Sequence, residues 1–176
     1  MPRSISRQQW LTEQDEAWCL RMNQASRIQW IRTAFCVISR LSDGVFWYAL
    51  MIAMLLFRGQ AAAHAVLHMA ATGVACTLLY KWLKTKTTRP RPYQRNRAIQ
   101  LVAAPLDEYS FPSGHTLYAV AFTVVALYHY PVLAVLLLPL TVLIAVSRVV
   151  LGLHYPSDVL AGVAIGLSIA SLSLLF

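Results

Sequence analysis

Apolar segments long enough for membrane helices alternate with short polar stretches over most of this chain. We find five of them, at about residues 38–57, 61–83, 116–130, 132–151 and 159–176. Each approaches the roughly 20 residues that a helix needs to cross the hydrocarbon core, the third only if its helix begins at Ser113. The polar stop Arg58-Gly59-Gln60 and the turn Tyr130-Pro131 separate neighbouring segments. The pattern predicts an all-α integral membrane helical bundle with about five transmembrane helices.

The N-terminal part has a different pattern. Residues 1–10 are polar and basic without an apolar core, so we expect no cleavable signal peptide. Between Trp10 and Leu41, apolar positions at helical spacing interleave with arginines, which is typical of an amphipathic interfacial helix lying on the membrane. We therefore expect one domain over residues 1–176, with an arm at 1–37 and a transmembrane catalytic core at 38–176.

Composition and charge narrow the class of protein. The chain is 58% hydrophobic and 12% charged, whereas soluble domains carry roughly 25% charged residues. The net charge is +8, and most of the basic residues lie in the N-terminal part and in a basic run at residues 81–97, between membrane segments, so we expect no nucleic-acid binding. Three widely spaced cysteines indicate neither a disulfide framework nor a zinc site, and we expect them to be packing residues.

Three polar groups interrupt the apolar pattern, and counting the spans places them on one side of the membrane. They are Lys84 with Arg91-Pro92, the tetrapeptide Pro112-Ser113-Gly114-His115, and Ser147-Arg148 followed by His154 and Asp158. Two crossings separate the second group from the third, so their ends meet on the same face. Ionisable residues at membrane helices are costly, and by default they mark function.

The residue types in these groups suit an oxyanion. Lys84, Arg91 and Arg148 supply permanent positive charge, and arginine grips phosphate through two parallel hydrogen bonds. Ser113 is a predicted N-cap, which leaves the backbone N–H groups of Gly114 and His115 and the positive helix end facing the same anion. The sequence thus predicts a phosphate cradle without a metal ligand set.

Two histidines add chemistry to this cradle. One imidazole can attack phosphorus to give a phosphohistidine, and a second can protonate the leaving oxygen. With Pro156 as a first helical residue, His154 lies just outside the helix and Asp158 in its first turn. From there the carboxylate can reach back and fix the tautomer of the imidazole.

The order and spacing of these motifs resemble a known family. Lys84-x6-Arg91-Pro92, Pro112-Ser113-Gly114-His115 and Ser147-Arg148-x5-His154-x3-Asp158 are similar to the three-part signature of the type 2 phosphatidic acid phosphatase superfamily. The resemblance implies that His154 is the nucleophile, Asp158 its partner and His115 the acid. It also implies that Lys84, Arg91, Ser113, Gly114 and Arg148 hold the phosphate, with no metal and no other cofactor.

The resemblance further implies a lipid phosphate substrate, with membrane lipids as the surroundings and protein partners left open. Candidate substrates are phosphatidylglycerophosphate, phosphatidic acid, undecaprenyl pyrophosphate and a lipid A phosphate. Several undecaprenyl pyrophosphate phosphatases of the superfamily carry Asp at the position of Gly114, which counts against that substrate. The family places its site on the non-cytoplasmic side, so we expect the periplasmic or extracellular face of a bacterial inner membrane. The positive-inside rule alone would put the basic run in the cytoplasm.

Other interpretations of the same residues remain. We expect the outer members of the basic run to anchor lipid headgroups; they are Lys86, Arg89, Arg95 and Arg97. Arg148 and Asp158 could form a structural ion pair. His64 and His68 have the spacing of a metal pair, but we expect packing histidines there, as for His129.

Two rival functions also remain open. The same residues would serve a phosphotransferase that passes phosphate to a second lipid. A catalytically silent membrane scaffold would keep the bundle without using the histidines.

Overall fold

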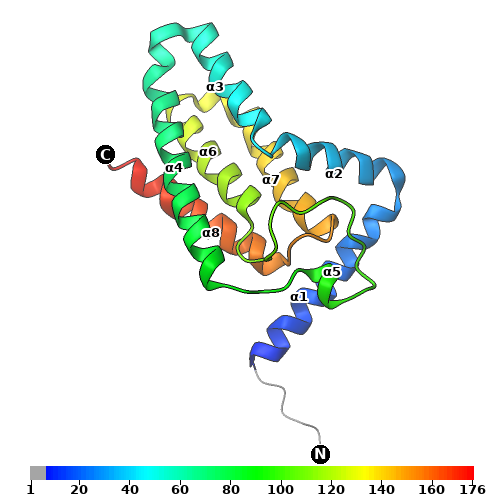
Figure 1. The fold of residues 1–176 in the computed structure, drawn as a ribbon. Coiled ribbons are helices and arrows are strands. Elements are labelled where there is room, and N and C mark those ends of the chain that lie inside the picture. Colours follow the sequence, from blue (N-terminus) through cyan, green and yellow to red (C-terminus); the bar gives the residue numbers. More distant parts are fainter. Residues whose placement is uncertain (1–6) are drawn as a thin grey trace, which may run out of the picture.

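The computed structural model describes residues 7–176, and every regular element in that range is helical (Figure 1). The all-α membrane bundle predicted from the sequence is confirmed. The α-helices are α1 Arg7–Asn23, α2 Gln29–Leu41, α3 Val45–Arg58, α4 Ala63–Lys86, α5 Pro92–Arg95, α6 Gly114–His129, α7 Ala134–Val150 and α8 Pro156–Ser173, with short 3-10 turns at Gln24–Arg27, Gly59–Ala62 and Pro131–Leu133.

Helices α3 and α4 form a long hairpin that reverses at Gly59–Ala62 (Figure 1). By length and apolarity, Val45–Lys86, Pro131–Val150 and Pro156–Ser173 qualify as membrane spans, and the first of these contains the whole hairpin. Outward side chains such as Phe57 and Val135 are 86% exposed, as lipid-facing residues of a membrane helix are. The predicted first span begins later than expected, because a turn at residues 42–44 separates α2 from α3.

Helix α6 lies at the centre of the bundle, in contact with α4, α7 and α8. It has 16 residues and so is about 24 Å long, shorter than the roughly 30 Å of hydrocarbon it was predicted to span. Ser113 is its N-cap residue, as expected. Gly162 and Gly166 of α8 face α6, where an added Cβ would lie 2.7 Å from the Ser113 carbonyl oxygen and 2.6 Å from that of Leu117. Small residues at this spacing let two membrane helices approach closely.

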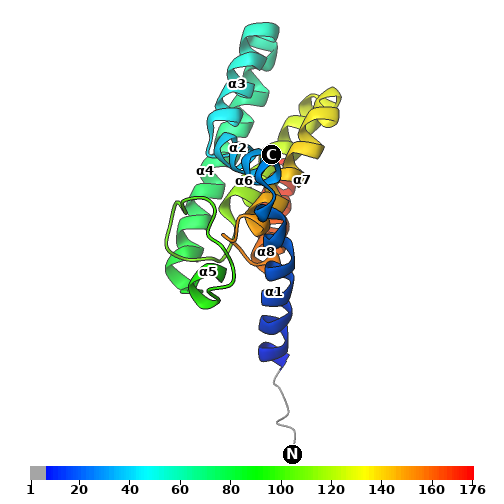
Figure 2. The ribbon, with the colours of Figure 1, turned by 90° about the vertical axis from the view of Figure 1, so that its right-hand side faces the viewer.

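The N-terminal arm forms two helices, joined through Gln24–Arg27, and the prediction of a single interfacial helix was wrong. Helix α1 packs against the ends of α7 and α8 (Figure 2), where its Cys19 is buried beside Tyr155. The Asn23 amide nitrogen donates to the backbone oxygens of Gln100 and Val150 at 3.0 and 2.9 Å. All three cysteines are free thiols, and burial raises the pKa of Cys19 to about 12.

The polar loops meet at one end of the bundle, as the count of spans predicted. The segment between α4 and α6 lies against the α7–α8 connection and the start of α8. Val102 N donates to Leu151 O at 3.3 Å, and Ser113 N donates to Asp158 O at 3.1 Å. The three polar groups of the sequence therefore lie together.

Candidate active site

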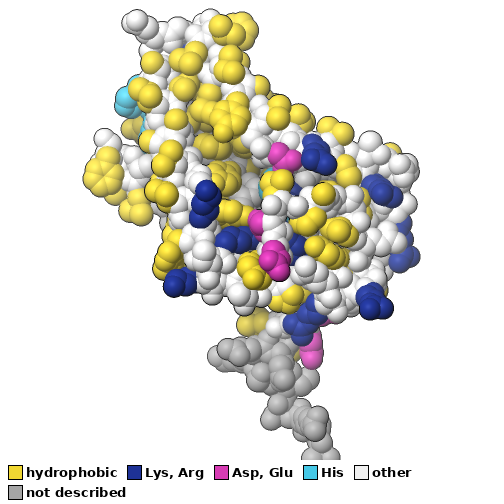
Figure 3. All heavy atoms as spheres, in the orientation of Figure 1, with side chains coloured by type: hydrophobic (Ala, Val, Ile, Leu, Met, Phe, Trp, Pro, Cys, Tyr) yellow, Lys and Arg dark blue, Asp and Glu magenta, His cyan; other side chains and the backbone are white. Residues whose placement is uncertain are grey.

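A cavity of about 550 Å³ opens at this end of the bundle and continues between the α3–α4 hairpin and α6. Five of the predicted site residues line it, namely Arg91, Gly114, His115, Arg148 and His154. Apolar side chains such as Trp47, Met51, Val74 and Phe122 line its other part. Figure 3 shows the outer end of the hairpin covered by hydrophobic side chains, with charged groups gathered around the lower, hollowed part. The cavity thus joins a polar end to an apolar channel.

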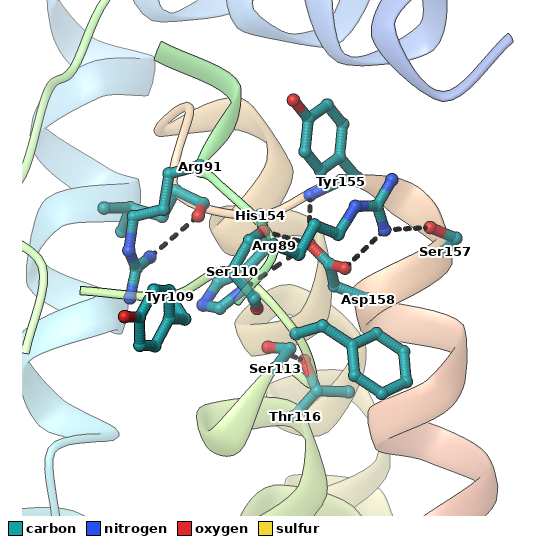
Figure 4. Close-up of polar contacts among 12 residues, drawn as sticks. Arg89, Arg91, Tyr109, Ser110, Ser113, Thr116, His154, Tyr155, Ser157 and Asp158 are labelled. Carbon is teal, nitrogen blue, oxygen red and sulfur yellow. Dashed lines mark hydrogen bonds and ion pairs between the residues drawn. The ribbon is translucent and has the colours of Figure 1, made fainter. Parts of the chain in front are cut away.

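His154 lies in the short connection between α7 and α8 and is 2% exposed. Its Nδ1 lies 2.6 Å from the backbone oxygen of Ser110 (Figure 4). A carbonyl oxygen only accepts, so Nδ1 carries the proton and Nε2 keeps its lone pair. Burial, reinforced by the charges of Arg148 and Arg91, lowers the pKa of His154 to about 3. At neutral pH this side chain is an uncharged imidazole.

Asp158, the expected partner of His154, does not contact the imidazole in the way that the sequence predicted. The Asp158 Oδ2 atom lies 3.8 Å from His154 Nδ1, too far for a direct hydrogen bond. The fully buried Asp158 carboxylate accepts instead from Tyr155 N at 2.9 Å, from the Ser110 hydroxyl and from Arg89. The tautomer is therefore fixed by the Ser110 carbonyl, and Asp158 holds the loop around it.

Arg89 is part of this network, and its predicted role as a headgroup anchor was wrong. Its Nη1 donates to Asp158 Oδ1 at 2.6 Å and to the Ser157 hydroxyl at 2.7 Å. Its Nη2 donates at 2.7 Å to Asp15 of α1. The predicted alternative of an Arg148–Asp158 ion pair does not form, because Arg89 takes that place (Figure 4).

Two of the predicted phosphate-binding cations share a carboxylate. Lys84 Nζ and Arg91 Nη2 each lie 2.7 Å from Asp107 Oδ1, and the Tyr80 hydroxyl also donates to Asp107. Burial would raise the pKa of Asp107, but the hydrogen bonds from Lys84 and Tyr80 outweigh it and lower that pKa. An ionised carboxylate thus occupies the place that the cations offer to an anion.

Arg148 is 2% exposed and lines the cavity. Its Nη1 donates to the Ser39 hydroxyl of α2, while its buried Nε has no acceptor among the residues that the structure describes. A buried guanidinium N–H without a partner costs free energy, which an oxyanion in the cavity would recover.

The first turn of α6 differs in detail from the prediction. The Ser113 side chain is fully buried and lies 2.9 Å from the Thr116 hydroxyl, so it does not line the cavity. Gly114 does line it, and an added Cβ there would lie 2.7 Å from the Tyr80 ring. Glycine therefore keeps the helix N-terminus open to the cavity while Tyr80 packs over it.

Besides Asp107, sequence reasoning missed a second acidic residue at the cavity, Asp43. His115 Nε2 lies 2.5 Å from Asp43 Oδ1, in the turn between α2 and α3. By its position, Asp43 falls near one end of the predicted span at residues 38–57, which by itself indicates no role. One signal was available, since Asp43 is the sole acid between Glu16 and Asp107.

The remaining histidines gather at the other end of α4 and α6. His68 Nδ1 lies 3.0 Å from His129 Nε2, its Nε2 lies 2.9 Å from the Ser173 hydroxyl, and the ring of His64 is 5.2 Å from that of His129. Within residues 7–176, no group of three or more His, Cys, Asp or Glu side chains is arranged to hold a metal ion.

Comparison with known proteins relates this site to a family. The model of the PAP2 superfamily matches residues 61–176. Undecaprenyl-diphosphatase BcrC of Bacillus subtilis is 30% identical over 126 residues, which are 71% of this chain and 65% of BcrC. Lipid A 1-phosphatase of Rhizobium johnstonii is 34% identical over 99 residues, 54% of this chain and 41% of that protein. The chain thus spans less than two thirds of these curated relatives.

The fold also has a counterpart among solved structures. The crystal structure of a transmembrane PAP2 type phosphatidylglycerolphosphate phosphatase from Bacillus subtilis has a TM-score of 0.67 and 24% sequence identity, covering 93% of this chain and 84% of that one. At this identity the likeness concerns the fold. Because the family model matches well over half of the residues, from α4 through the cavity to the C-terminus, the chain belongs to the PAP2 superfamily.

Proposed function

We propose that this protein is a membrane-embedded lipid phosphate phosphatase that works through a phosphohistidine at His154 and without a metal cofactor. The observation that carries the proposal is a neutral, buried imidazole in a cavity that also presents Arg91 and Arg148. Its Nδ1 proton is held by Ser110, which leaves the Nε2 lone pair available for phosphorus. The superfamily relatives named above act on lipid phosphates, which supports the same class here.

In the first step, Nε2 of His154 forms a bond to phosphorus while the bond from phosphorus to the leaving oxygen breaks. The imidazolium of His115 gives its proton to that oxygen. In the second step, water adds to phosphorus and the nitrogen–phosphorus bond breaks. The neutral His115 takes the water proton and returns to the imidazolium form.

Positive charge around the cavity favours the pentacoordinate transition state. Arg148 and the N-terminus of α6 at Gly114 are in place for the phosphoryl oxygens. Lys84 and Arg91 become available when the phosphate displaces the Asp107 carboxylate. The buried Asp158 acts at a distance, because its hydrogen bonds hold the loop that carries His154.

The apolar part of the cavity supports a lipid as the substrate. Trp47, Met51 and Val74 line a channel between the α3–α4 hairpin and α6 that a hydrocarbon chain would fill. Candidate substrates are phosphatidylglycerophosphate, phosphatidic acid, undecaprenyl pyrophosphate and a lipid A phosphate. We propose the inner membrane of a bacterium, with the cavity on the periplasmic or extracellular face.

The arm belongs to the same catalytic unit in this proposal. Asp15 of α1 contacts Arg89, and Ser39 of α2 contacts Arg148. Residues 1–176 would then act as one domain, with α1 and α2 each holding one of these cations in place.

Release of inorganic phosphate by the detergent-purified protein tests the proposal on the four lipid classes. We expect release by the parent and none by His154→Ala. Absence of release by the parent from all four lipids would refute the phosphatase. Product that appears only when a second lipid is added would instead indicate a phosphotransferase. No product with or without the second lipid would indicate a silent scaffold.

A further inference from the structure

Asp43, which lies outside the segment matched by the family model, contacts the histidine that we assign as the acid. Its Oδ1 lies 2.5 Å from His115 Nε2, and both residues line the cavity. The two side chains are 24% and 10% exposed, so the pair is largely shielded from solvent. A charge-assisted hydrogen bond in such a place is stronger than one in water.

The turn that carries Asp43 is well defined. Asp43 N donates to Arg40 O at 3.1 Å, which closes the end of α2. Gly44 follows with φ of 118°, a backbone conformation that favours glycine. Trp47, in the first turn of α3, is 2% exposed and packs on the ring of Phe122 in α6. The turn therefore holds the carboxylate against α6.

The charges around the pair favour an ionised Asp43. The hydrogen bond from His115 lowers the pKa of Asp43 against the opposing effect of burial, and Arg148 and Arg40 contribute in the same direction as His115. Arg40 is the weakest partner, since its guanidinium is 4.0 Å away and 74% exposed. A carboxylate only accepts, so His115 Nε2 carries a proton and Nδ1 is the nitrogen left to exchange one.

We propose that Asp43 is the positioning residue of the acid His115: it orients the imidazole and stabilises the imidazolium that protonates the leaving oxygen. The inference rests on the proposed function and adds to it a carboxylate that supports the acid His115 directly. Burial disfavours the charged form of both imidazoles, but only His115 has a carboxylate within hydrogen-bond distance that opposes this effect. One site thus prepares one imidazole as a nucleophile and the other as an acid.

A leaving-group comparison separates this role from a merely structural one. An alkyl phosphate releases an alkoxide that needs a proton, whereas nitrophenyl phosphate releases a stable phenolate without one. If Asp43 acts through the acid, Asp43→Asn should lower kcat on a long-chain alkyl phosphate by roughly 10- to 100-fold, less than the roughly 10²- to 10⁴-fold of a lost general acid. Turnover of nitrophenyl phosphate should change little. Loosened packing would lower both rates alike.

The experiment measures the rates on the alkyl phosphate and on nitrophenyl phosphate with the same purified sample. The ratio of these two rates therefore does not depend on the fraction of folded enzyme. His115→Ala should shift the ratio at least as far as Asp43→Asn. Asp43→Glu, which keeps a carboxylate, should restore much of it. Arg40→Gln is the matched control, since it removes the exposed ion pair to Asp43 without touching His115, and its ratio should equal that of the parent.

The outcomes separate this inference from the proposed function. Parental activity together with an unchanged ratio in Asp43→Asn would overturn the role of Asp43 and leave the phosphatase standing. Two results together would also overturn the role of Asp43: a ratio shifted in Asp43→Asn that Asp43→Glu does not restore, and the same shift in Arg40→Gln. They would assign the effect to the shape of the turn. No phosphate release by the parent from any lipid phosphate would refute the proposed function and this inference with it.

Discussion

Replacing Gly162 by alanine should reduce activity more than stability. The new Cβ would lie 2.7 Å from the Ser113 carbonyl oxygen and 3.3 Å from Leu117 N, both backbone atoms of the α6 N-terminal turn. Ordinary van der Waals contact begins at 3.4 Å, so about 0.7 Å must be gained by moving α8 away from α6. Ser113 N also donates to Asp158 O, which carries the displacement into the loop of His154.

The magnitudes of the two effects differ. Overpacking costs about 1–3 kcal/mol, and the better helix propensity of alanine returns up to about 1 kcal/mol, which leaves a net loss of roughly 0–3 kcal/mol in unfolding free energy. A misplacement of about 1 Å at a catalytic group can cost 10²-fold in rate. We therefore expect Gly162→Ala to lower kcat by about tenfold or more while the protein still folds.

The assay compares kcat and the melting temperature in detergent with those of Gly166→Ala. That variant meets a similar obstruction, 2.6 Å from Leu117 O, but lies one turn further from Asp158, about 6 Å along the helix. It should lose similar stability and less activity. The reasoning is refuted if Gly162→Ala keeps parental kcat, or if Gly166→Ala loses as much activity.

Three further predictions follow from the charges. Arg89→Gln leaves the fully buried Asp158 without its charged partner, so the melting temperature should fall. Breaking a buried ion pair costs about 3–5 kcal/mol, and we expect a smaller loss of unfolding free energy here because Arg89 is 27% exposed. An unchanged melting temperature would contradict the role of Arg89. Asp107→Asn frees Lys84 and Arg91, so inorganic phosphate should inhibit hydrolysis at several-fold lower concentration, and weaker inhibition would contradict the account. Burial lowers the pKa of His154 from 6.5 to about 3. Between these values the unfolded chain binds a proton that the folded protein does not, so the contribution of His154 to stability is fully present above pH 6.5 and declines toward pH 3. Melting scans from pH 7.5 to about 4.5 should show this decline, and His154→Asn should reduce it.

Much of the site followed from the sequence because its residue types are costly in a membrane. Arg148 and His154 stand out from apolar surroundings, and Lys84 and Arg91 belong to a basic run between membrane segments. Counting the spans was enough to bring these residues to one face. The start of α8 at Pro156 followed from the fixed φ of proline.

The rest depended on tertiary contacts that no local pattern encodes. The contact of Ser110 with His154 uses the backbone carbonyl, which every residue has, so the residue type carries no signal for that contact. Arg89 and Arg91 occur in adjacent Arg-Pro pairs, and only the fold decides that one meets Asp158 and the other Asp107. The role of the arm was hidden too, because Asp15 reaches Arg89 across 74 residues of sequence.

Trapping the covalent intermediate tests the central claim most directly. A radiolabelled lipid phosphate is mixed with the purified protein, the reaction is stopped in base within the first turnover, and the labelled residue is identified by peptide mapping. The account predicts acid-labile label on His154, absent in His154→Ala. Label on another residue, or phosphate release by His154→Ala at the parental rate, would contradict it.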